Sequence, residues 1–290
     1  MVTAINAINK IFCGLMCILL TLTGTLNGFF NSDKTEYTDL GGVVGLESLV
    51  RAQGVTTDGE NIIYSGKSAL EKVSSDNKTV LAINTEAIPS ELADSYGIKH
   101  IGGISYADGK IYAALEDSKV WKHPIVAVYD AENLEYTGVF YELSTDRHTR
   151  GIPWVVADGE NGILYAGDSR NCNSVMKYDL DTMEFLGEFT FSQEIEKIQG
   201  GEYYNGTLYF GTNDTTRAVY SVNADDGTVQ KLFGRITYEY KYIDNFGGEG
   251  EDVTVMTVDG KPMICTLQIG VTFTDATLRG YEINYSKRHK

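Results

Sequence analysis

The chain has 290 residues, 42% of them hydrophobic, so it can bury a complete core as one all-β domain of ordinary size. Its 31 glycines and 19 tyrosines, beside only 4 prolines, suit many short strands joined by tight turns. The formal net charge of -16 excludes nucleic-acid binding through the phosphate backbone. It favours cationic partners, or simply keeps an exported protein soluble.

Residues 1–30 read as a targeting segment rather than as part of the fold. Lys10 precedes the uncharged apolar run IFCGLMCILLTLTG, which continues more weakly to Phe30. This run is typical of a signal peptide, and with its weaker tail it is also about long enough for an uncleaved membrane anchor. We therefore expect an extracytoplasmic protein, secreted or tethered by its N-terminus. We expect it to contact the membrane only through this segment.

Residues 31–50 form a linker, and a repeated unit follows from residue 51 to residue 290. The repeats align on five glycines that lie about 48 residues apart, within the range of propeller blades: Gly54, Gly103, Gly151, Gly201 and Gly248. Each unit opens with a glycine-led strand, then a turn such as ADGK or YNGT, then an apolar strand. Two more strands follow, as in IVAVYDAENLEYTGVFY.

This pattern predicts an all-β, five-bladed β-propeller with four-stranded blades, because radial closure protects the sheet edges. The glycines fit the innermost strands, where a Cβ would obstruct the neighbouring blade. A β-sandwich needs no constant period, and a solenoid coil is usually shorter. The fifth unit provides three strands before the chain ends, so Tyr37–Val44 is a candidate for its fourth strand. A short helix is expected to begin near Ser90.

Cys172 and Cys265 are the two cysteines beyond the targeting segment. They lie in the third and fifth repeats at different points of the unit. Neighbouring repeats are the ones that touch, so we expect two free, buried thiols rather than a disulfide.

The phrases QGVTTDGENIIYSG, IQGGEYYNGTLYFGT, VYDAENLEYTG and KYDLDTMEFLGEF resemble the blades of YVTN-type propellers. They are also similar to the five-bladed glutamine cyclotransferase family. The resemblance covers most of residues 51–285. It implies the five-bladed architecture and, as one option for activity, cyclisation of an N-terminal glutamine. None of that family's catalytic positions is matched residue by residue.

The candidate site lies on one face of the propeller. The loops that lead into the inner strands share a face with the loops between the second and third strands, and they converge on the axis. Both sets are rich in polar groups. The candidate ligand-binding residues are Gln53, His100, His148, Arg150, Trp154, Gln199, Glu202, Glu249 and Glu251.

Several roles remain open for these residues. Glu202 or His100 is the candidate for general acid or base chemistry. Glu202 and Glu249 occupy the same aligned position in adjacent blades, so their carboxylates are expected to approach each other. Glu202, Glu249 and Glu251 are weak candidates for calcium ligands, and no cofactor is otherwise expected. The alternative for each single residue is a structural role in the loops, and Trp154 would then be buried between blades.

Two classes of function follow. The first is a monomeric binding or scaffold module that recognises a small molecule, a glycan or a peptide at the mouth of the axial channel. The second is an enzyme. It would be a glutaminyl-peptide cyclotransferase-like protein, with Glu202 shuttling a proton while Gln53 or Gln199 holds the amide, or a metal-dependent hydrolase.

Overall fold

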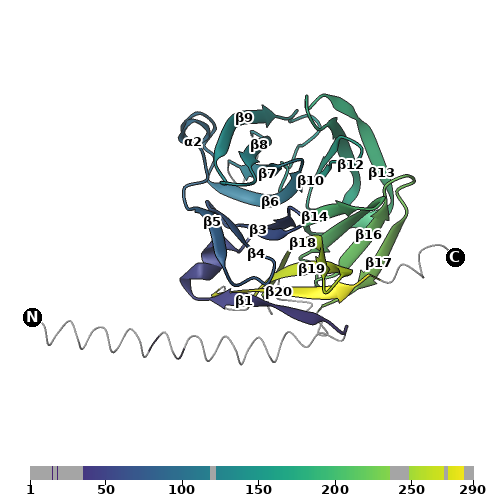
Figure 1. The fold of residues 1–290 in the computed structure, drawn as a ribbon. Coiled ribbons are helices and arrows are strands. Elements are labelled where there is room, and N and C mark those ends of the chain that lie inside the picture. Colours follow the sequence, from purple (N-terminus) through teal and green to yellow (C-terminus); the bar gives the residue numbers. More distant parts are fainter. Residues whose placement is uncertain are drawn as a thin grey trace, which may run out of the picture.

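The computed structural model describes residues 35–117, 122–235, 248–270 and 274–283, together with Leu15 and Ile18. Five antiparallel four-stranded sheets are arranged around a common centre, with β6, β10, β14 and β18 facing it (Figure 1). The all-β, five-bladed prediction is therefore confirmed. The expected targeting segment, residues 1–30, lies outside the described residues apart from two isolated positions. Among the residues that are described, no helix is long and apolar enough to cross a bilayer.

The first four blades each use four consecutive strands, and the fifth takes its outermost strand from the other end of the chain. Blade 1 contains β2 (Gly54–Thr57), β3 (Asn61–Ser65), β4 (Leu70–Ser74) and β5 (Val80–Asn84). Blade 2 contains β6 (His100–Ala107), β7 (Lys110–Glu116), β8 (Ile125–Asp130) and β9 (Tyr136–Glu142). Blade 3 contains β10 (Trp154–Asp158), β11 (Ile163–Gly167), β12 (Cys172–Asp179) and β13 (Phe185–Ile195). Blade 4 contains β14 (Ile198–Tyr204), β15 (Thr207–Thr212), β16 (Val219–Asn223) and β17 (Val229–Phe233). Blade 5 contains β18 (Glu249–Val258), β19 (Lys261–Ile269), β20 (Asp275–Glu282) and β1 (Thr38–Val44).

Strand β1 closes the ring by pairing antiparallel with β20, from Thr38 opposite Gly280 to Val44 opposite Asp275. This strand lies within Tyr37–Val44, the segment that the sequence predicted as a candidate fourth strand of the fifth blade. Two short helices complete the described secondary structure: the 3-10 helix η1 (Leu46–Val50) and α2 (Ser90–Tyr96). Helix α2 begins at the expected residue and lies at the periphery beside β9 (Figure 1).

The described residues form five apolar clusters in the core, one at each contact between neighbouring blades. Inner glycines allow this close approach, as expected from the repeat. A Cβ on Gly54 would lie 2.9 Å from the Ile104 nitrogen, and one on Gly103 would lie 2.9 Å from the Trp154 Cβ. Cys172 and Cys265 are free and buried in different clusters, as predicted.

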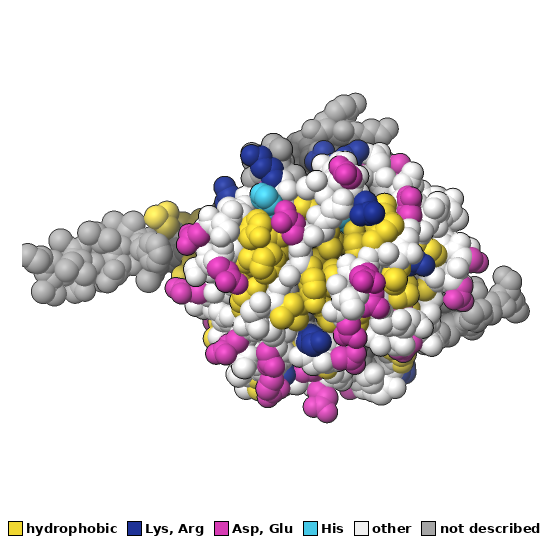
Figure 2. Space-filling model, turned by 90° about the horizontal axis from the view of Figure 1, so that it is seen from above, with side chains coloured by type: hydrophobic (Ala, Val, Ile, Leu, Met, Phe, Trp, Pro, Cys, Tyr) yellow, Lys and Arg dark blue, Asp and Glu magenta, His cyan; other side chains and the backbone are white. Residues whose placement is uncertain are grey.

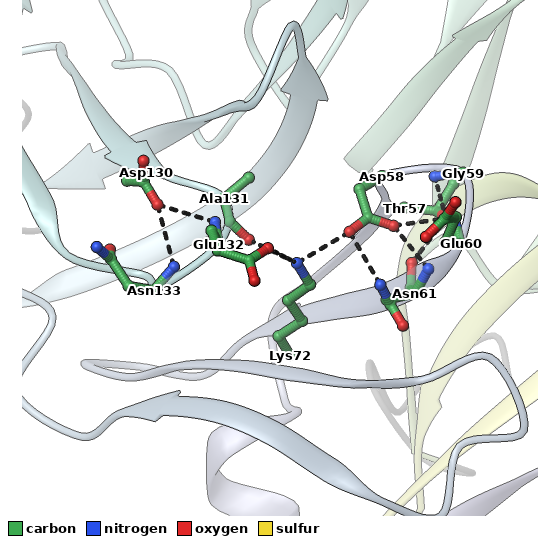
Figure 3. Close-up of polar contacts among 10 residues, drawn as sticks. All are labelled: Thr57, Asp58, Gly59, Glu60, Asn61, Lys72, Asp130, Ala131, Glu132 and Asn133. Atoms are coloured by element: carbon green, nitrogen blue, oxygen red, sulfur yellow. Dashed lines mark hydrogen bonds and ion pairs between the residues drawn. The ribbon is translucent and has the colours of Figure 1, made fainter.

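We call the face that carries the loops into the inner strands the upper face, and the opposite face the lower face. On the lower face Lys72 of β4 ties blade 1 to blade 2 (Figure 3). Its Nζ lies 3.1 Å from Asp58 Oδ2, 3.0 Å from Glu132 Oε2 and 3.1 Å from the Ala131 carbonyl oxygen. Burial opposes the charge on Lys72, but these hydrogen bonds outweigh it and raise its pKa.

The flank formed by β9 and β13 exposes apolar side chains. Figure 2 looks down on this flank, which is at the top of Figure 1. Val139, Phe185 and Leu186 are between 41% and 52% exposed. The guanidinium carbon of Arg147 lies 4.0 Å from the centroid of the Phe185 ring. A charge over the outermost strand discourages another strand from adding to this edge.

Candidate functional site

Glu202 on β14 lies where the inner strands meet, with 7% of the residue exposed. Three hydroxyl groups donate hydrogen bonds to its carboxyl group. Thr56 Oγ1 and Thr254 Oγ1 reach Oε2 at 2.9 and 3.0 Å, and Ser105 Oγ reaches Oε1 at 3.3 Å. Blades 1, 2 and 5 thus hold a carboxyl group that belongs to blade 4.

Two of these hydroxyl groups also accept hydrogen bonds from backbone N–H groups of the next blade. Thr56 Oγ1 accepts from the Tyr106 nitrogen at 3.1 Å, and Ser105 Oγ accepts from the Ala157 nitrogen at 2.9 Å. The axial network therefore reaches all five blades. Burial is the largest influence on Glu202 and raises its pKa to about 7, although the hydroxyl donors act in the opposite direction.

Asp252 on β18 is a second axial carboxyl group and is fully buried. It accepts hydrogen bonds from the backbone nitrogens of Val253 at 2.8 Å and Val55 at 3.2 Å. Burial raises its pKa well above the ordinary value, and the nearby charge of Glu202 adds to the effect. A Cβ on Gly200 would collide with the Asp252 carboxyl group, so that carboxyl group would have to move to admit a side chain there.

Glu249 and Glu251 form a separate pair at the start of β18. Burial, followed by the charge of Glu249 and a hydrogen bond with it, raises the pKa of Glu251 well above its ordinary value. Arg235 lies beside this pair, fully buried, and donates to the carbonyl oxygens of Arg217 at 2.6 Å and Leu267 at 3.2 Å. Glu249 thus has a charged neighbour in Glu251 on its own strand, and Glu202 has one in Asp252. The expected approach of Glu202 to Glu249 stays a prediction.

Blade 2 presents His100 and Glu116 on the upper face, at the paired ends of β6 and β7. His100 Nδ1 lies 3.2 Å from Glu116 Oε2, close enough for an ion pair but without the geometry of a hydrogen bond. Both side chains are one-quarter exposed. Gln53 and Gln199 are half-buried on the loop into β2 and near the start of β14.

Blade 3 carries a small polar pocket of about 170 Å³ on the upper face. Arg150 Nε lies 3.3 Å from Asp168 Oδ2, and its Nη1 lies 3.5 Å from the Arg170 carbonyl oxygen. The Arg150 side chain is 54% exposed, and that of Asp168 is 29% exposed. The pocket therefore offers guanidinium donors and a carboxylate acceptor side by side.

His148 lines the same pocket but is 4% exposed, and its Nε2 is 2.7 Å from the Tyr178 hydroxyl oxygen. Burial, assisted by the charge of Arg147, lowers its pKa to about 4. His148 is therefore neutral at physiological pH. Its role in the pocket is to hold the loop against blade 3 rather than to carry charge.

Trp154 is fully buried in the cluster between blades 3 and 4, with its ring centroid 5.2 Å from that of Phe210. This is the alternative placement considered from the sequence, in the core rather than at an exposed mouth. Among the described residues, no group of three or more histidine, cysteine, aspartate or glutamate residues is arranged to hold a metal ion. The weak expectation of calcium stays a prediction.

The structure thus places most of the candidates in three groups: the axial carboxyl groups, the Glu249–Glu251 pair, and the rims of blades 2 and 3. Gln53 and Gln199 lie at the starts of blades 1 and 4, and Trp154 is in the core. The sequence did not indicate Thr56, Ser105, Thr254 or Arg235 as members of these groups. Thr56 and Ser105 each lie two residues after a repeat glycine, which was an available signal, whereas Thr254 lies six residues after Gly248 and had none. For Arg235, the signal was only a single basic residue at the end of blade 4, which does not by itself indicate a buried arginine.

Comparison with known proteins leaves the family of this chain open. No protein-family model matches it, and no curated protein matches it. Solved structures with low overall similarity include Sqt1 from Saccharomyces cerevisiae, at a TM-score of 0.37 and 13% identity over 77% of this chain and 55% of that one. They also include the computationally designed protein Ika8, at a TM-score of 0.38 and 12% identity over 80% and 70% of the two chains. This chain spans about half the length of Sqt1. The resemblance to the YVTN and glutamine cyclotransferase propellers stays a prediction.

Proposed function

We propose that this protein is an extracytoplasmic, monomeric binding module that recognises a polypeptide segment on its upper face. A rigid scaffold with polar loops on one face is the general setting for such recognition. The observation that carries the proposal is the pocket on blade 3. There, the Arg150 side chain and the Arg170 backbone nitrogen contact Asp168 in a space of about 170 Å³.

The size and chemistry of this pocket favour part of a peptide over a whole small molecule. Pockets for drug-sized ligands usually have volumes of about 300–1,000 Å³, so this pocket fits one side chain. An amide group matches it best, because its oxygen accepts from a guanidinium while its NH₂ donates to a carboxylate. We therefore favour the side chain of glutamine or asparagine in the bound segment.

The test uses three capped amino acids: acetyl-glutamine, acetyl-glutamate and acetyl-leucine N-methylamides. Binding is followed by NMR on the purified propeller. We expect the glutamine compound to bind most tightly, and the double variant Arg150→Gln/Asp168→Asn to lose that preference. Lys110→Gln, a change in an exposed residue next to a lower-face turn, is the matched control. Equal binding of all three compounds, or equal loss in the control, would contradict the proposal.

An enzymatic function is the second candidate, and the pKa of Glu202 favours it. A carboxyl group with a pKa of about 7 is suited to proton transfer at neutral pH. Against it, three hydroxyl groups occupy that carboxyl group and only 7% of the residue is exposed. Ammonia release from a peptide with an N-terminal glutamine, abolished by Glu202→Gln, would establish a cyclotransferase-like reaction and displace the binding proposal.

A further inference from the structure

A second hollow, which we call the lateral groove, lies on the flank where blades 4 and 5 meet. Its volume is about 560 Å³, within the usual range for small-molecule sites. It runs between β17 and the lower-face ends of β1 and β20, away from the upper-face pocket. The described residues that line it include Glu36, Tyr37, Gln230, Phe233, Tyr281 and Glu282.

Three aromatic rings meet along this groove. Phe233 and Tyr281 are stacked with their ring centroids 4.3 Å apart, and Tyr37 lies 6.1 Å from Tyr281. Tyr281 is buried, whereas Tyr37 is 40% exposed and Phe233 is half-buried. Gly280 adds no side chain to the space beside Met263. The groove therefore has an aromatic wall.

Among the described residues that line the groove, the charged groups are of one sign. Glu36 and Glu282 are exposed, and no lysine, arginine or histidine is among the described residues that line it. Glu282 does accept from Lys261 Nζ at 3.0 Å, but both side chains are more than 60% exposed. Such surface pairs are weak, so a bound cation can compete with Lys261.

The neighbourhood already contains one cation on an aromatic face. The guanidinium carbon of Arg279 lies 4.5 Å from the centroid of the Tyr37 ring. Aromatic faces attract cations through the ring quadrupole, and the attraction strengthens where water is excluded. Carboxylates next to such rings add a direct electrostatic attraction.

We propose that the lateral groove is a binding site for a small organic cation, such as an alkylammonium or quaternary ammonium compound. Its apolar groups lie against Phe233 and Tyr37, and its charge lies near Glu36 and Glu282. Gln230 offers an amide for a hydroxyl or carbonyl group of the same ligand. The proposal is independent of the upper-face function, because the two sites share no residue.

The test compares choline with 3,3-dimethylbutan-1-ol, which has the same shape without the charge. Each is titrated into the full-length protein and followed by isothermal calorimetry at low and high salt. We expect saturable binding of choline, weakened by salt, and little or no binding of the neutral alcohol. Saturable binding of both with equal affinity, or no saturable binding of choline, would overturn the proposal.

Variants identify the site. Glu36→Gln/Glu282→Gln keeps the shape of the groove and removes its charge, and Phe233→Leu removes one ring. Each should weaken choline binding by about fivefold or more. Asp225→Asn/Asp226→Asn, which changes two exposed acids in a turn of blade 4 outside the groove, is the control. An equal loss in this control would assign the effect to the net charge of the protein and would refute the site.

Discussion

At the scale of single residues, Glu202 makes stability depend on pH. Its pKa is raised from 4.5 to about 7 in the folded protein, so the folded state favours the protonated carboxyl group. That contribution is complete below pH 4.5 and is lost as the pH rises through 7. Burial also raises the pKa values of Asp252 and Glu251, which add losses of the same sign.

We therefore predict that Glu202→Gln flattens the fall in stability between pH 5 and pH 8. Glutamine reproduces the neutral form of the carboxyl group and does not titrate. Over this pH range the free energy of unfolding should therefore decrease less in the variant than in the wild type, by up to about 3 kcal/mol. Urea unfolding at a series of pH values measures this, with the exposed Glu135→Gln as control. Parallel curves for Glu202→Gln and the wild type would show that this carboxyl group does not titrate as described.

At the scale of elements, the third strand of blade 1 carries charged residues into the interior. Glu71 and Lys72 are 4% and 5% exposed, because Glu71 meets Arg51 Nε at 2.5 Å and Lys72 bridges two turns. Lys72→Met should lower the free energy of unfolding by about 1–3 kcal/mol, since Asp58 loses its ion-pair partner. Chemical denaturation measures the change. Lys78→Met removes an exposed ion pair with Asp76 and should have an effect of less than about 0.5 kcal/mol. Equal effects would contradict the role given to Lys72.

The same scale explains what the sequence could and could not predict. The turns Asp108-Gly109, Asn205-Gly206 and Asp259-Gly260 of blades 2, 4 and 5 adopt positive φ at both residues, as two-residue hairpins require. Blades 1 and 3 have a longer turn at the same point of the repeat. Repeats of this kind determine the number of strands and their order. The helix that begins at Ser90 could also be predicted, because its residues interrupt the strand pattern between two repeats.

The axial network of hydrogen bonds around Glu202 could not be predicted from the sequence, because the inner strands are irregular. Bulges shift the register between Ile101 and Ile104 in β6, between Ile198 and Gly200 in β14, and between Gly250 and Val253 in β18. An extra residue turns the following side chains to the other face of a strand. Alignment on the repeat glycines therefore cannot show that Thr254 reaches Glu202. The burial of Lys72 was equally hidden, since a lysine in a strand usually indicates a solvent-exposed face.

At the scale of the whole molecule, the ring is closed by backbone contact between β1 and β20. Without β1, β20 would be an open edge and blade 5 would have three strands. Gly42 is at the centre of this contact, because a Cβ there would lie 2.4 Å from the Ala276 carbonyl oxygen and 3.0 Å from the Thr277 Cα. Both neighbours are backbone atoms, so they can yield only if the strands separate.

We predict that Gly42→Val lowers the free energy of unfolding by about 1–3 kcal/mol, the usual cost of overpacking. The effect should reach every blade, since each inner strand contacts its neighbours around the ring. Urea unfolding followed by both tryptophan fluorescence and circular dichroism should therefore give one transition with a lower midpoint. Thr38→Val, at the exposed end of the same strand, should leave the midpoint nearly unchanged.

If Gly42→Val unfolds at the same urea concentration as Thr38→Val, β1 does not contribute to stability and the ring is held together without it. If the two probes separate only in Gly42→Val, blade 5 opens before the other four, and closure by β1 is what makes the five blades unfold together.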